Sequence, residues 1–339
     1  MVLAYGAEPH LGECVDAILS QDIDLELLLV DNGAAAAVAG LPMDARLSIV
    51  RPDDNTGFSG GCNLGAARAS ADVLAFVNSD AVLAPGALQA LVRSLEADDV
   101  ALACGRVTLA SHPSQVNSVG NPIHWTGLSW AGGYGEPVNE HASAHDVTSI
   151  TGALFAARRA AWEALGGFDQ DYFAYHEDAD LSLRAWLRGM RVTYAPDAVA
   201  RHHYEFHRNP QKVYLLERNR LQTVLTTYPA ALLRRLLPGL LMFEVVSCLV
   251  ALVQGWLPQK LKGYGWLLAR RDDLRERRRG VQGTRTMADA AFAQLLSARL
   301  EPANLERPPG LGALNLVLSS YFRLATRTLR QPVPGGKPG

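Results

Sequence analysis

The chain has 339 residues, of which 48% are hydrophobic and 19% are charged, so it can bury one large core or two modest ones. This composition excludes a disordered chain, a collagen-like chain and a small disulfide scaffold. The net charge of −2 conceals two halves of opposite sign, because residues 1–200 carry 10 Lys/Arg against 25 Asp/Glu and residues 201–339 carry 22 against 9. An acidic half that binds a phosphorylated ligand needs a metal ion or well-placed N–H groups, whereas a basic half suits phosphate or an anionic membrane surface.

Nucleic acid would also suit a basic half, but no nucleic-acid motif or Lys-rich tract accompanies it, so we expect no nucleic-acid partner. Four cysteines lie far apart, without metal-ligand spacing, at Cys14, Cys62, Cys104 and Cys248. They predict buried free thiols in a reducing compartment. The first ten residues lack the basic and apolar regions of a signal peptide, so we expect the N-terminal half to stay in the cytoplasm.

Short apolar runs alternate with amphipathic stretches over the first 110 residues. The predicted strands lie over residues 2–5, 25–31, 47–51, 73–78 and 100–108. The predicted helices lie between them, over residues 11–20, 60–70 and 85–96. This alternation predicts a mostly parallel sheet covered by helices. Ligands bind such sheets at the carboxyl ends of the strands, so the polar residues that close the runs are candidate site residues: Tyr5, Asp31, Asn78 and Asp80.

Residues 111–146 are rich in Gly, Ser, His and Trp and predict a long excursion with a hairpin around 123–130. A strand over 147–157, helices over 158–165 and 177–188, and a strand over 191–194 are expected next. From Pro210 onward the pattern is helical and basic. We therefore expect a first domain over 1–208, a helical region over 209–330 that associates with a membrane or dimerises, and a disordered tail over 331–339.

Residues 236–257 form a long apolar stretch that would suffice to span a bilayer. Glu244 near its middle costs about 2.5–3.5 kcal/mol on insertion scales, and Pro238 and Gln254 weaken its ends. The alternatives to a span are a buried or dimer-forming helix and a helix at the membrane interface. A second amphipathic helix is predicted over 314–329. In a basic half, the two helices favour peripheral attachment to an anionic membrane surface.

Three acidic positions close predicted strands or open a helix: Asp31, Asp80, and the cluster of Glu177, Asp178 and Asp180. Asp31 and Asp80 are also typical turn formers, and an acid at the start of a helix complements the helix dipole, so both interpretations stay open for each. Between these acids lies a Gly-rich stretch, residues 55–65, that opens a helix. Its backbone N–H groups can approach an anionic ligand, although a tight strand-to-helix turn explains the same pattern.

Five motifs follow one another along the first 205 residues. They are Val30-Asp31-Asn32, then Asn55-x-Gly57-Phe58-x-x-Gly61-x-Asn63-x-Gly65, then Asn78-x-Asp80, then the block from Gly166 to Gly189 with Glu177-Asp178-x-Asp180-Leu-x-x-Arg184, and finally Tyr194-x-Pro196 with His202. Their order and spacing resemble family 2 glycosyltransferases, and within them the rhamnosyltransferase-like bacterial enzymes. The resemblance implies an α/β GT-A fold with a mostly parallel central sheet, an inverting mechanism and a nucleoside-diphosphate-sugar donor.

The resemblance also implies roles for single residues. Asp31 resembles the acid that binds the donor base, Asp80 the metal-holding acid of a DxD-type motif, and Asp178 the general base. His202 resembles the histidine that completes the metal site, with His203 as its substitute if the register is shifted by one. The remaining donor-side candidates are Tyr5, Asn55, Gly57, Asn63, Asn78 and Gly152.

Five further residues are candidates for the acceptor side or for support of the site: Trp125, His176, Glu177, Asp180 and Arg184. For three of them two interpretations stay open. Trp125 stacks on a sugar or belongs to the core, and His176 contacts the acceptor or caps the helix. Arg184 approaches the diphosphate or pairs with Asp180.

The chemistry agrees with these roles. Mg²⁺ or Mn²⁺ offsets the charge of a diphosphate leaving group, and one carboxylate suffices to take the proton of the attacking hydroxyl. We therefore expect an inverting, metal-dependent enzyme that moves a sugar from a dTDP-, UDP- or GDP-sugar to a hydroxyl of a lipid-linked or cell-envelope glycan. The expected place is the inner face of the plasma membrane, with a polyprenyl-linked acceptor and a homodimer as further partners. The alternatives are a non-catalytic scaffold on the same fold and a sugar-nucleotide pyrophosphorylase, whose N-terminal Gly/Arg loop the chain lacks.

Overall fold

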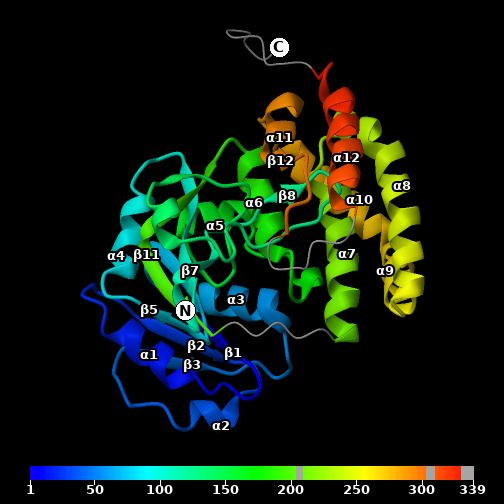
Figure 1. The fold of residues 1–339 in the computed structure, drawn as a ribbon. Helices are drawn as coiled ribbons and strands as arrows, with labels where there is room; N and C mark the ends of the chain where they lie inside the picture. Colours follow the sequence, from blue (N-terminus) through cyan, green and yellow to red (C-terminus); the bar gives the residue numbers. More distant parts are fainter. Residues whose placement is uncertain (204–208, 303–309, 330–339) are drawn as a thin grey trace. The chain divides into compact units, whose positions relative to one another are not determined.

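A computed structural model describes residues 1–203, 209–302 and 310–329 (Figure 1). The chain separates into two compact units. The first unit comprises Met1–Asn121, Trp130–Ala185 and Met190–His207, and the second comprises Pro122–Ser129, Trp186–Gly189 and Arg208–Gly339. The second unit thus takes in two short segments from within the expected first domain. The expected tail, 331–339, lies outside the described residues.

The first unit is built on a ten-stranded sheet. Its main strands lie in the order β3 (Leu47–Val50), β2 (Leu27–Asp31), β1 (Val2–Ala4), β4 (Val73–Asn78), β10 (Leu154–Arg158), β6 (Val100–Leu109), β11 (Arg191–His202) and β5 (Ala81–Leu83). β7 (His112–Ser118) pairs with β6, and β9 (His145–Asp146) pairs with β11. β3, β2, β1 and β4 run parallel, as do β6 and β11, while β10 is antiparallel to both of its neighbours. This sheet confirms the predicted α/β fold.

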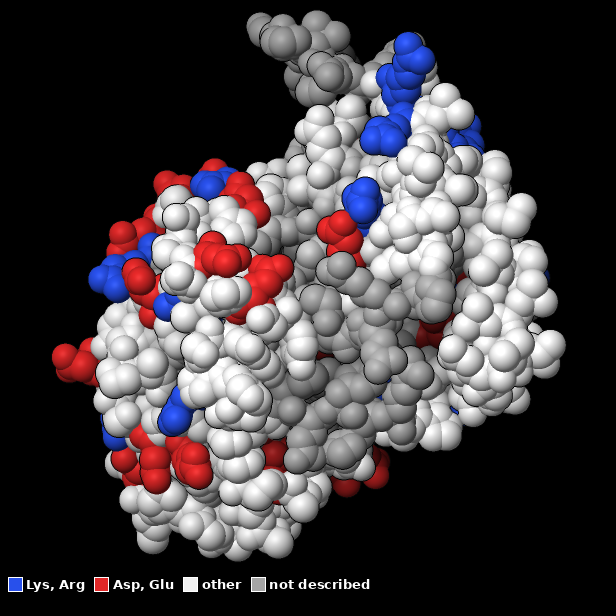
Figure 2. Space-filling view, viewed as in Figure 1, with Lys and Arg blue, Asp and Glu red and all other residues white. Residues whose placement is uncertain are grey.

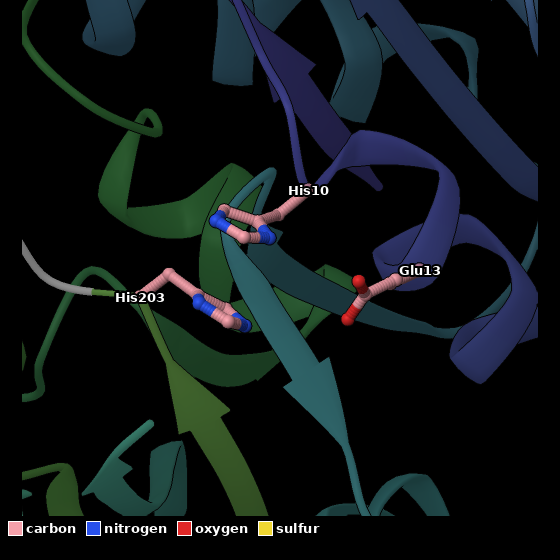
Figure 3. Close-up of side chains that lie close together, drawn as sticks. All are labelled: His10, Glu13 and His203. Carbon is pink, nitrogen blue, oxygen red and sulfur yellow. The ribbon is translucent and has the colours of Figure 1, made fainter. Parts of the chain in front are cut away.

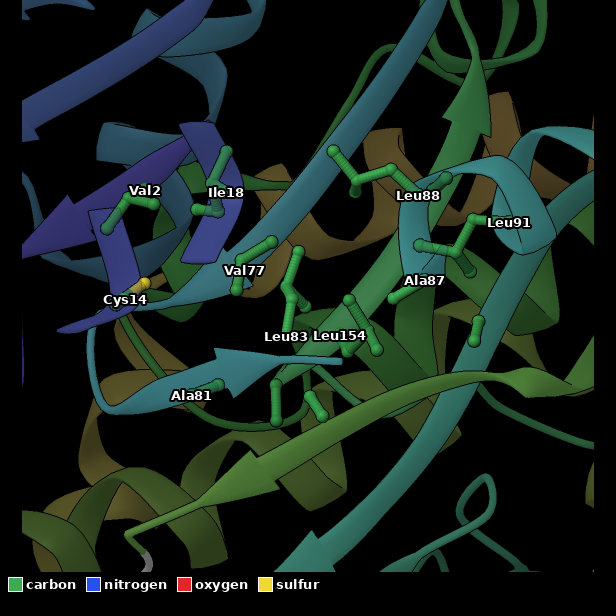
Figure 4. Packing of buried hydrophobic residues seen from close by; sticks show 14 of the residues in the cluster. Val2, Cys14, Ile18, Val77, Ala81, Leu83, Ala87, Leu88, Leu91 and Leu154 are labelled. Atoms are coloured by element: carbon green, nitrogen blue, oxygen red, sulfur yellow. The ribbon is translucent and has the colours of Figure 1, made fainter. Parts of the chain in front are cut away.

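Among the described residues, six α-helices belong wholly or largely to the first unit: α1 (Leu11–Leu19), α2 (Ala35–Val38), α3 (Gly57–Arg68), α4 (Ala87–Ser94), α5 (Arg159–Leu165) and α6 (Glu177–Leu187). α1 buries Leu11, Cys14, Val15 and Ile18, which share one face at helical spacing. Together with apolar residues of α4 and of β1, β4, β5 and β10 they form the main hydrophobic core (Figure 4). Burying these side chains holds the carboxyl ends of the strands in fixed positions.

The sheet differs from the sequence prediction at several strands, among them β7 and β9, which lie within the predicted excursion over 111–146. β10 starts at Leu154 instead of 147, and β5 was not predicted. β11 continues to His202, although Pro196 cannot donate a ladder hydrogen bond. A register shift between Ala195 and Val199 takes Pro196 out of the ladder as a bulge, so the strand resumes beyond it.

The second unit is mainly helical. Its helices are α7 (Pro210–Thr227), α8 (Ala230–Val253), α9 (Leu257–Ala269), α10 (Arg271–Gly283), α11 (Asp289–Leu295) and α12 (Leu311–Thr326). Two short strands, β8 (Ile123–His124) and β12 (Leu296–Ser297), pair in parallel. Among the described residues, α8 is the one helix whose length and composition would allow it to cross a membrane, and 17% of its most apolar window is buried.

All four cysteines are free thiols, as predicted, and three of them are buried. Cys14, Cys62 and Cys104 are buried and unbridged, and Cys248 is unbridged and half-buried in α8. Burial raises the pKa of the Cys14 and Cys104 thiols to about 12, because it disfavours the thiolate. These thiols are therefore core side chains rather than nucleophiles.

Candidate active site

Two strand ends bring Asp80 and His202 together. β4 ends at Asn78, the chain turns through Ser79 and Asp80, and β5 begins at Ala81, which lies opposite His202 in the antiparallel β5–β11 pair. His202 Nε2 lies 2.9 Å from Asp80 Oδ1. The two residues that resemble metal ligands, far apart in the sequence, are therefore neighbours in the first unit.

The surroundings of His202 make this pair suited to a cation. His202 Nδ1 lies 2.9 Å from Asn117 Oδ1, and because an amide oxygen can only accept, Nδ1 carries the hydrogen. In the neutral ring, Nε2 then directs a lone pair at the Asp80 carboxylate, so a proton or a metal ion must lie between them. Two adjacent ligands of an octahedral Mg²⁺ at 2.0–2.1 Å are about 3 Å apart, which fits the observed separation. The carboxylate of Asp80 and the imidazole of His202 thus form a donor set that a divalent cation could occupy.

A second group of possible ligands lies nearby and was not predicted as a set. Single ligand atoms of His10, Glu13 and His203 all lie within 4.8 Å of one another (Figure 3). The rings of His10 and His203 are stacked, with centroids 3.5 Å apart and an angle of 14° between planes. Imidazole lone pairs lie in the ring plane, so two stacked rings cannot both aim at one ion. In this arrangement His203, the alternative ligand, stacks on His10.

Asp178 lies in the first turn of α6, after a strained segment. Phe173, Tyr175 and His176 have φ values of 63°, 70° and 68°, which L-residues rarely adopt. Each such residue costs on the order of 1–3 kcal/mol, and strain of this kind clusters at functional sites. His176 is buried, and its carbonyl accepts the N–H of Asp180 at 2.9 Å. It therefore occupies the start of the helix, as the capping interpretation expects.

The Asp178 carboxylate is held by three N–H donors. Asn121 Nδ2 donates to Oδ2 at 3.2 Å, the backbone N–H of Ala179 donates to Oδ1 at 2.8 Å, and the backbone N–H of Gly152 also donates. Burial nevertheless raises the pKa of Asp178 to about 6, because it disfavours the ionised form. This carboxylate is ionised at neutral pH and has an affinity for a proton that suits a general base.

Glu177 differs from its neighbour. Burial, and then the adjacent Asp178 and Asp180, raise the pKa of Glu177 well above its usual value. The protonated form of this carboxyl group is therefore favoured, and within the described part of the chain its Oε2 has no hydrogen-bond partner. Glu177 therefore takes up a proton more readily than an exposed glutamate, and its protonated form places no second negative charge beside Asp178.

The donor-side candidates lie around the carboxyl ends of β1 and β2. Asp31 Oδ1 accepts the N–H of Ala34 at 2.8 Å, and Oδ2 pairs with Arg51 Nε at 3.0 Å. Asp31 thus forms the turn after β2 and also carries an ion pair, and Arg51 was not predicted. Tyr5 is 59% exposed. Asn55 Oδ1 accepts from Asn32 Nδ2 at 2.8 Å and from the N–H of Gly57 at 2.9 Å.

Close packing explains the glycine at the start of α3. Gly57 has a φ of +68°, and a Cβ there would lie 2.4 Å from the carbonyl oxygen of Phe173. The N–H of Ser59 donates to that same oxygen at 3.1 Å. The Gly-rich stretch therefore packs against the strained segment that precedes Asp178. Gly152 lies beside the ring of Phe58, and the N–H of Asn78 donates to Ala153 O at 3.0 Å.

Three candidates, Asn63, Asp180 and Arg184, form hydrogen bonds or ion pairs within the protein. Asn63 donates to Phe168 O at 2.7 Å and accepts from Phe168 N at 2.9 Å, so its amide holds a turn, and its contact with the donor stays a prediction. Arg184 pairs with Asp180 at 2.8 Å and donates to the carbonyls of Leu165 and Gly167. Both side chains are buried, so Arg184 takes the pairing alternative and not the diphosphate one.

Trp125 also belongs to a core. It is fully buried in the second unit, where its ring packs against Tyr321 and Phe322. Of its two interpretations, the contacts therefore support the core position. Two residues that the sequence did not indicate, Asn117 and Asn121, contact His202 and Asp178 instead. Both lie in or next to a segment with weak periodicity, which gave no signal for them.

Comparisons with solved structures identify the fold as GT-A. The GalNAc-T7 crystal structure with UDP, GalNAc and Mn²⁺ matches with a TM-score of 0.55 and 14% identity over 68% of this chain and 47% of that one. Our chain thus spans about half the length of that structure. The structure of S. aureus TarS 1-349 in complex with UDP-GlcNAc matches with a TM-score of 0.51 and 14% identity over 96% of this chain and 89% of that one.

Sequence comparison gives the family. The profile described as glycosyltransferase like family 2 matches residues 1–224, and the chain therefore belongs to this family of glycosyltransferases. N-acetylglucosaminyl-diphospho-decaprenol L-rhamnosyltransferase of Mycobacterium tuberculosis is 26% identical over 234 residues, 60% of this chain and 75% of that protein. Rhamnosyltransferase WbbL of Escherichia coli is 43% identical over 63 residues, 19% of this chain and 24% of that protein. These similarities support the rhamnosyltransferase-like branch.

Proposed function

We propose that this glycosyltransferase is inverting and metal-dependent, and that it moves a sugar from a dTDP-, UDP- or GDP-sugar to a hydroxyl of a lipid-linked cell-envelope glycan. The observation that carries the proposal is the Asp80–His202 pair, in which Asn117 leaves the His202 Nε2 lone pair facing a carboxylate. The solved structure of GalNAc-T7 with UDP and Mn²⁺ supports a divalent cation in this fold. Mg²⁺ and Mn²⁺ both suit this donor set.

The proposed mechanism uses one base. The acceptor hydroxyl oxygen attacks the anomeric carbon from the face opposite the diphosphate, and the bond to the diphosphate oxygen breaks with its electron pair. Asp178 takes the proton of the hydroxyl as the new bond forms. When bound, the cation offsets the negative charge of the departing diphosphate. Asp80 and His202 would hold the cation, and Asp31 with Tyr5 would hold the donor base.

The structure around Asp178 supports its assignment as the base. The N–H groups of Asn121, Ala179 and Gly152 orient its carboxylate, and burial keeps its pKa close to 6. Burial and the neighbouring carboxylates favour the protonated form of Glu177, and in that form it does not compete with Asp178 for the hydroxyl proton. His176, buried at the helix start, supports the position of this pair.

The acceptor and the place of action are proposed from a relative. The name of the M. tuberculosis rhamnosyltransferase indicates a diphospho-decaprenol-linked acceptor for that protein. We infer the same class, a polyprenyl-linked glycan, for this chain. An enzyme with such an acceptor works at the membrane surface, and we place it as a peripheral protein on the inner face of the plasma membrane.

Thermal unfolding of the purified protein tests the donor site. UDP, dTDP and GDP are compared, each with Mn²⁺ and with EDTA, in the wild type, in Asp80→Ala and in the control Glu13→Gln. A ligand that binds the folded state raises Tm, so we expect a rise of a few degrees with one nucleotide that needs the metal. It should be lost in Asp80→Ala and kept in Glu13→Gln. No rise with any nucleotide would favour the scaffold alternative.

A further inference from the structure

Helix α8 in the second unit turns its apolar side outward. From Leu237 to Val253 every exposed residue is apolar: Leu237, Pro238, Leu241, Met242, Val245, Val246, Leu249, Val250, Leu252 and Val253. A surface helix of a water-soluble protein has the opposite arrangement, with its apolar stripe toward the core. An exposed apolar surface of this extent indicates a site of interaction.

The inward side of α8 carries its charge. Glu244 contacts Arg220 of α7 and Lys260 of α9, and it accepts the hydroxyl of Tyr264 at 2.6 Å. Glu217 contacts the same two cations, Arg220 at 3.1 Å and Lys260. The side chains of Arg220 and Lys260 are 1% and 0% exposed. A bilayer-spanning α8 would either break these ion pairs or draw them into lipid, where charges are costly.

Helix α12 extends the outward surface. The Tyr321 hydroxyl donates to Arg235 O at 2.7 Å and accepts from Gly239 N at 3.1 Å, so α12 lies against the first half of α8. α12 exposes four large apolar side chains, Leu314, Leu316, Val317 and Leu324. We call the exposed apolar residues of α8 and α12 the apolar face. Figure 2 shows the surface over these helices largely without charged side chains.

Basic residues gather at one end of the apolar face. Arg235 contacts the backbone of Ala325 at 3.4 Å, which places the start of α8 beside the end of α12. Arg234, Arg235, Arg323 and Arg327 are all exposed there. Figure 2 shows Lys and Arg side chains near that end of α12. Apolar side chains flanked by arginines match the chemistry of a bilayer with anionic headgroups.

We propose that the apolar face seats the second unit on an anionic lipid bilayer, with α8 lying in the plane of the interface and not across the membrane. The side chains that α8 exposes between Leu237 and Val253 are all apolar and none is aromatic, whereas a protein partner usually meets aromatic anchors. A lipid surface does not require such anchors. The proposal deepens the proposed function and rests on it for the location of the acceptor, but its geometry is independent of the sugar site.

Vesicle binding tests the proposal. The full chain is mixed with vesicles of phosphatidylcholine alone or with phosphatidylglycerol, and bound protein is separated by flotation. Leu241→Glu/Val245→Glu places two charges on the apolar face, at side chains that are both 58% exposed. Met43→Glu/Ile49→Glu is the matched control, because it adds the same charge at exposed positions of the first unit.

We expect the wild type and the control to bind the anionic vesicles and the α8 variant to bind at least tenfold more weakly. Arg323→Gln/Arg327→Gln should lose the preference for phosphatidylglycerol. Equal binding by the α8 variant, or no binding by the wild type, overturns the proposal. A dimer that the α8 variant dissociates, without vesicle binding, would assign the apolar face to a second copy of the chain.

Two further measurements separate the outcomes. Alkaline carbonate releases a protein that lies on a membrane and leaves a spanning one in place, so retention after extraction would overturn the in-plane position of α8. The rise in Tm with nucleotide and Mn²⁺ should be the same in the α8 variant and the wild type. If that rise is absent in both while vesicles are bound, the proposed function fails and the membrane surface stands.

Discussion

At the scale of single residues, Asp178 gives the enzyme an expected pH dependence. Burial raises the pKa of this carboxyl to about 6, and only the ionised form can take a proton. We expect kcat/KM to rise with pH up to about 6 and then to level, as measured with saturating Mn²⁺. Asp178→Asn should lower kcat by about 10²–10⁴-fold, the usual contribution of a general base. If the residual activity of Asp178→Asn still rises with pH up to about 6, the pH dependence belongs to another group.

The same shift has a consequence for stability. Folding raises the pKa of this carboxyl, so the folded state is favoured when the carboxyl is protonated. This contribution to the free energy of unfolding is fully present below the pKa of the unfolded chain, 3.8, and is lost as the pH rises through the folded pKa of about 6. Asp178→Asn removes the buried charge, so it should raise Tm at pH 7.5 and change it little at pH 4. Activity and stability therefore oppose each other at this position.

Asn121 is expected to act through Asp178. Its Nδ2 donates to the Asp178 carboxylate, and its Oδ1 lies 3.0 Å from the Ser118 hydroxyl, which fixes the orientation of the amide. Asn121→Ala removes a donor that favours the ionised carboxylate, so the acidic limb of the pH profile should move to higher pH. Ser118→Ala should move it in the same direction by a smaller amount. A loss of activity in Asn121→Ala with an unmoved limb would indicate that Asn121 contributes to structure alone.

His202 and His203 are distinguished by their contacts. His202 faces Asp80, whereas His203 stacks on His10. We expect His202→Ala to lose the metal-dependent rise in Tm with nucleotide and His203→Gln to retain it. The opposite result would place the cation at His10, Glu13 and His203, which requires one imidazole to rotate out of the stack.

At the scale of elements, the start of α3 depends on a contact that no propensity describes. Gly57 and Gly166 both have a positive φ, +68° and +79° respectively. A Cβ added at Gly57 would lie 2.4 Å from Phe173 O, whereas a Cβ added at Gly166 would have no atom within 4 Å. Gly166→Ala therefore measures backbone strain alone, about 1 kcal/mol. Gly57→Ala adds the clash and should cost at least about 2 kcal/mol in urea unfolding. Equal losses would show that α3 shifts to accommodate the methyl group.

The elements also show what the sequence could predict. Asp31 and Asp80 were found because they follow apolar runs, and the ends of such runs meet at one edge of the sheet. Asn117 and Asn121 could not be predicted from the sequence, because their positions depend on long-range pairing of an irregular segment with β6 and with Ser149. Arg184 and Asn63 fitted the family pattern yet hold turns, because a motif does not separate residues that touch a ligand from those that support the fold.

At the scale of the whole molecule, the opposite charges of the two halves set how membrane binding responds to salt. Residues 201–339 carry 22 Lys/Arg against 9 Asp/Glu, so anionic lipid attracts this half and repels residues 1–200, which carry 10 against 25. The screening length falls from about 10 Å at 0.1 M to about 3 Å at 1 M salt, and burial of the apolar face is not screened.

We therefore expect the affinity for phosphatidylglycerol vesicles to fall as salt is raised from about 0.1 M to about 1 M and then to keep a residual value. Arg323→Gln/Arg327→Gln should flatten this dependence, and Leu241→Glu/Val245→Glu should remove the residual binding. Complete release of the wild type at high salt would mean that charge alone holds the protein. Binding that does not change with salt would mean that the arginines of α8 and α12 do not face the lipid. The apolar face would then supply the whole attraction.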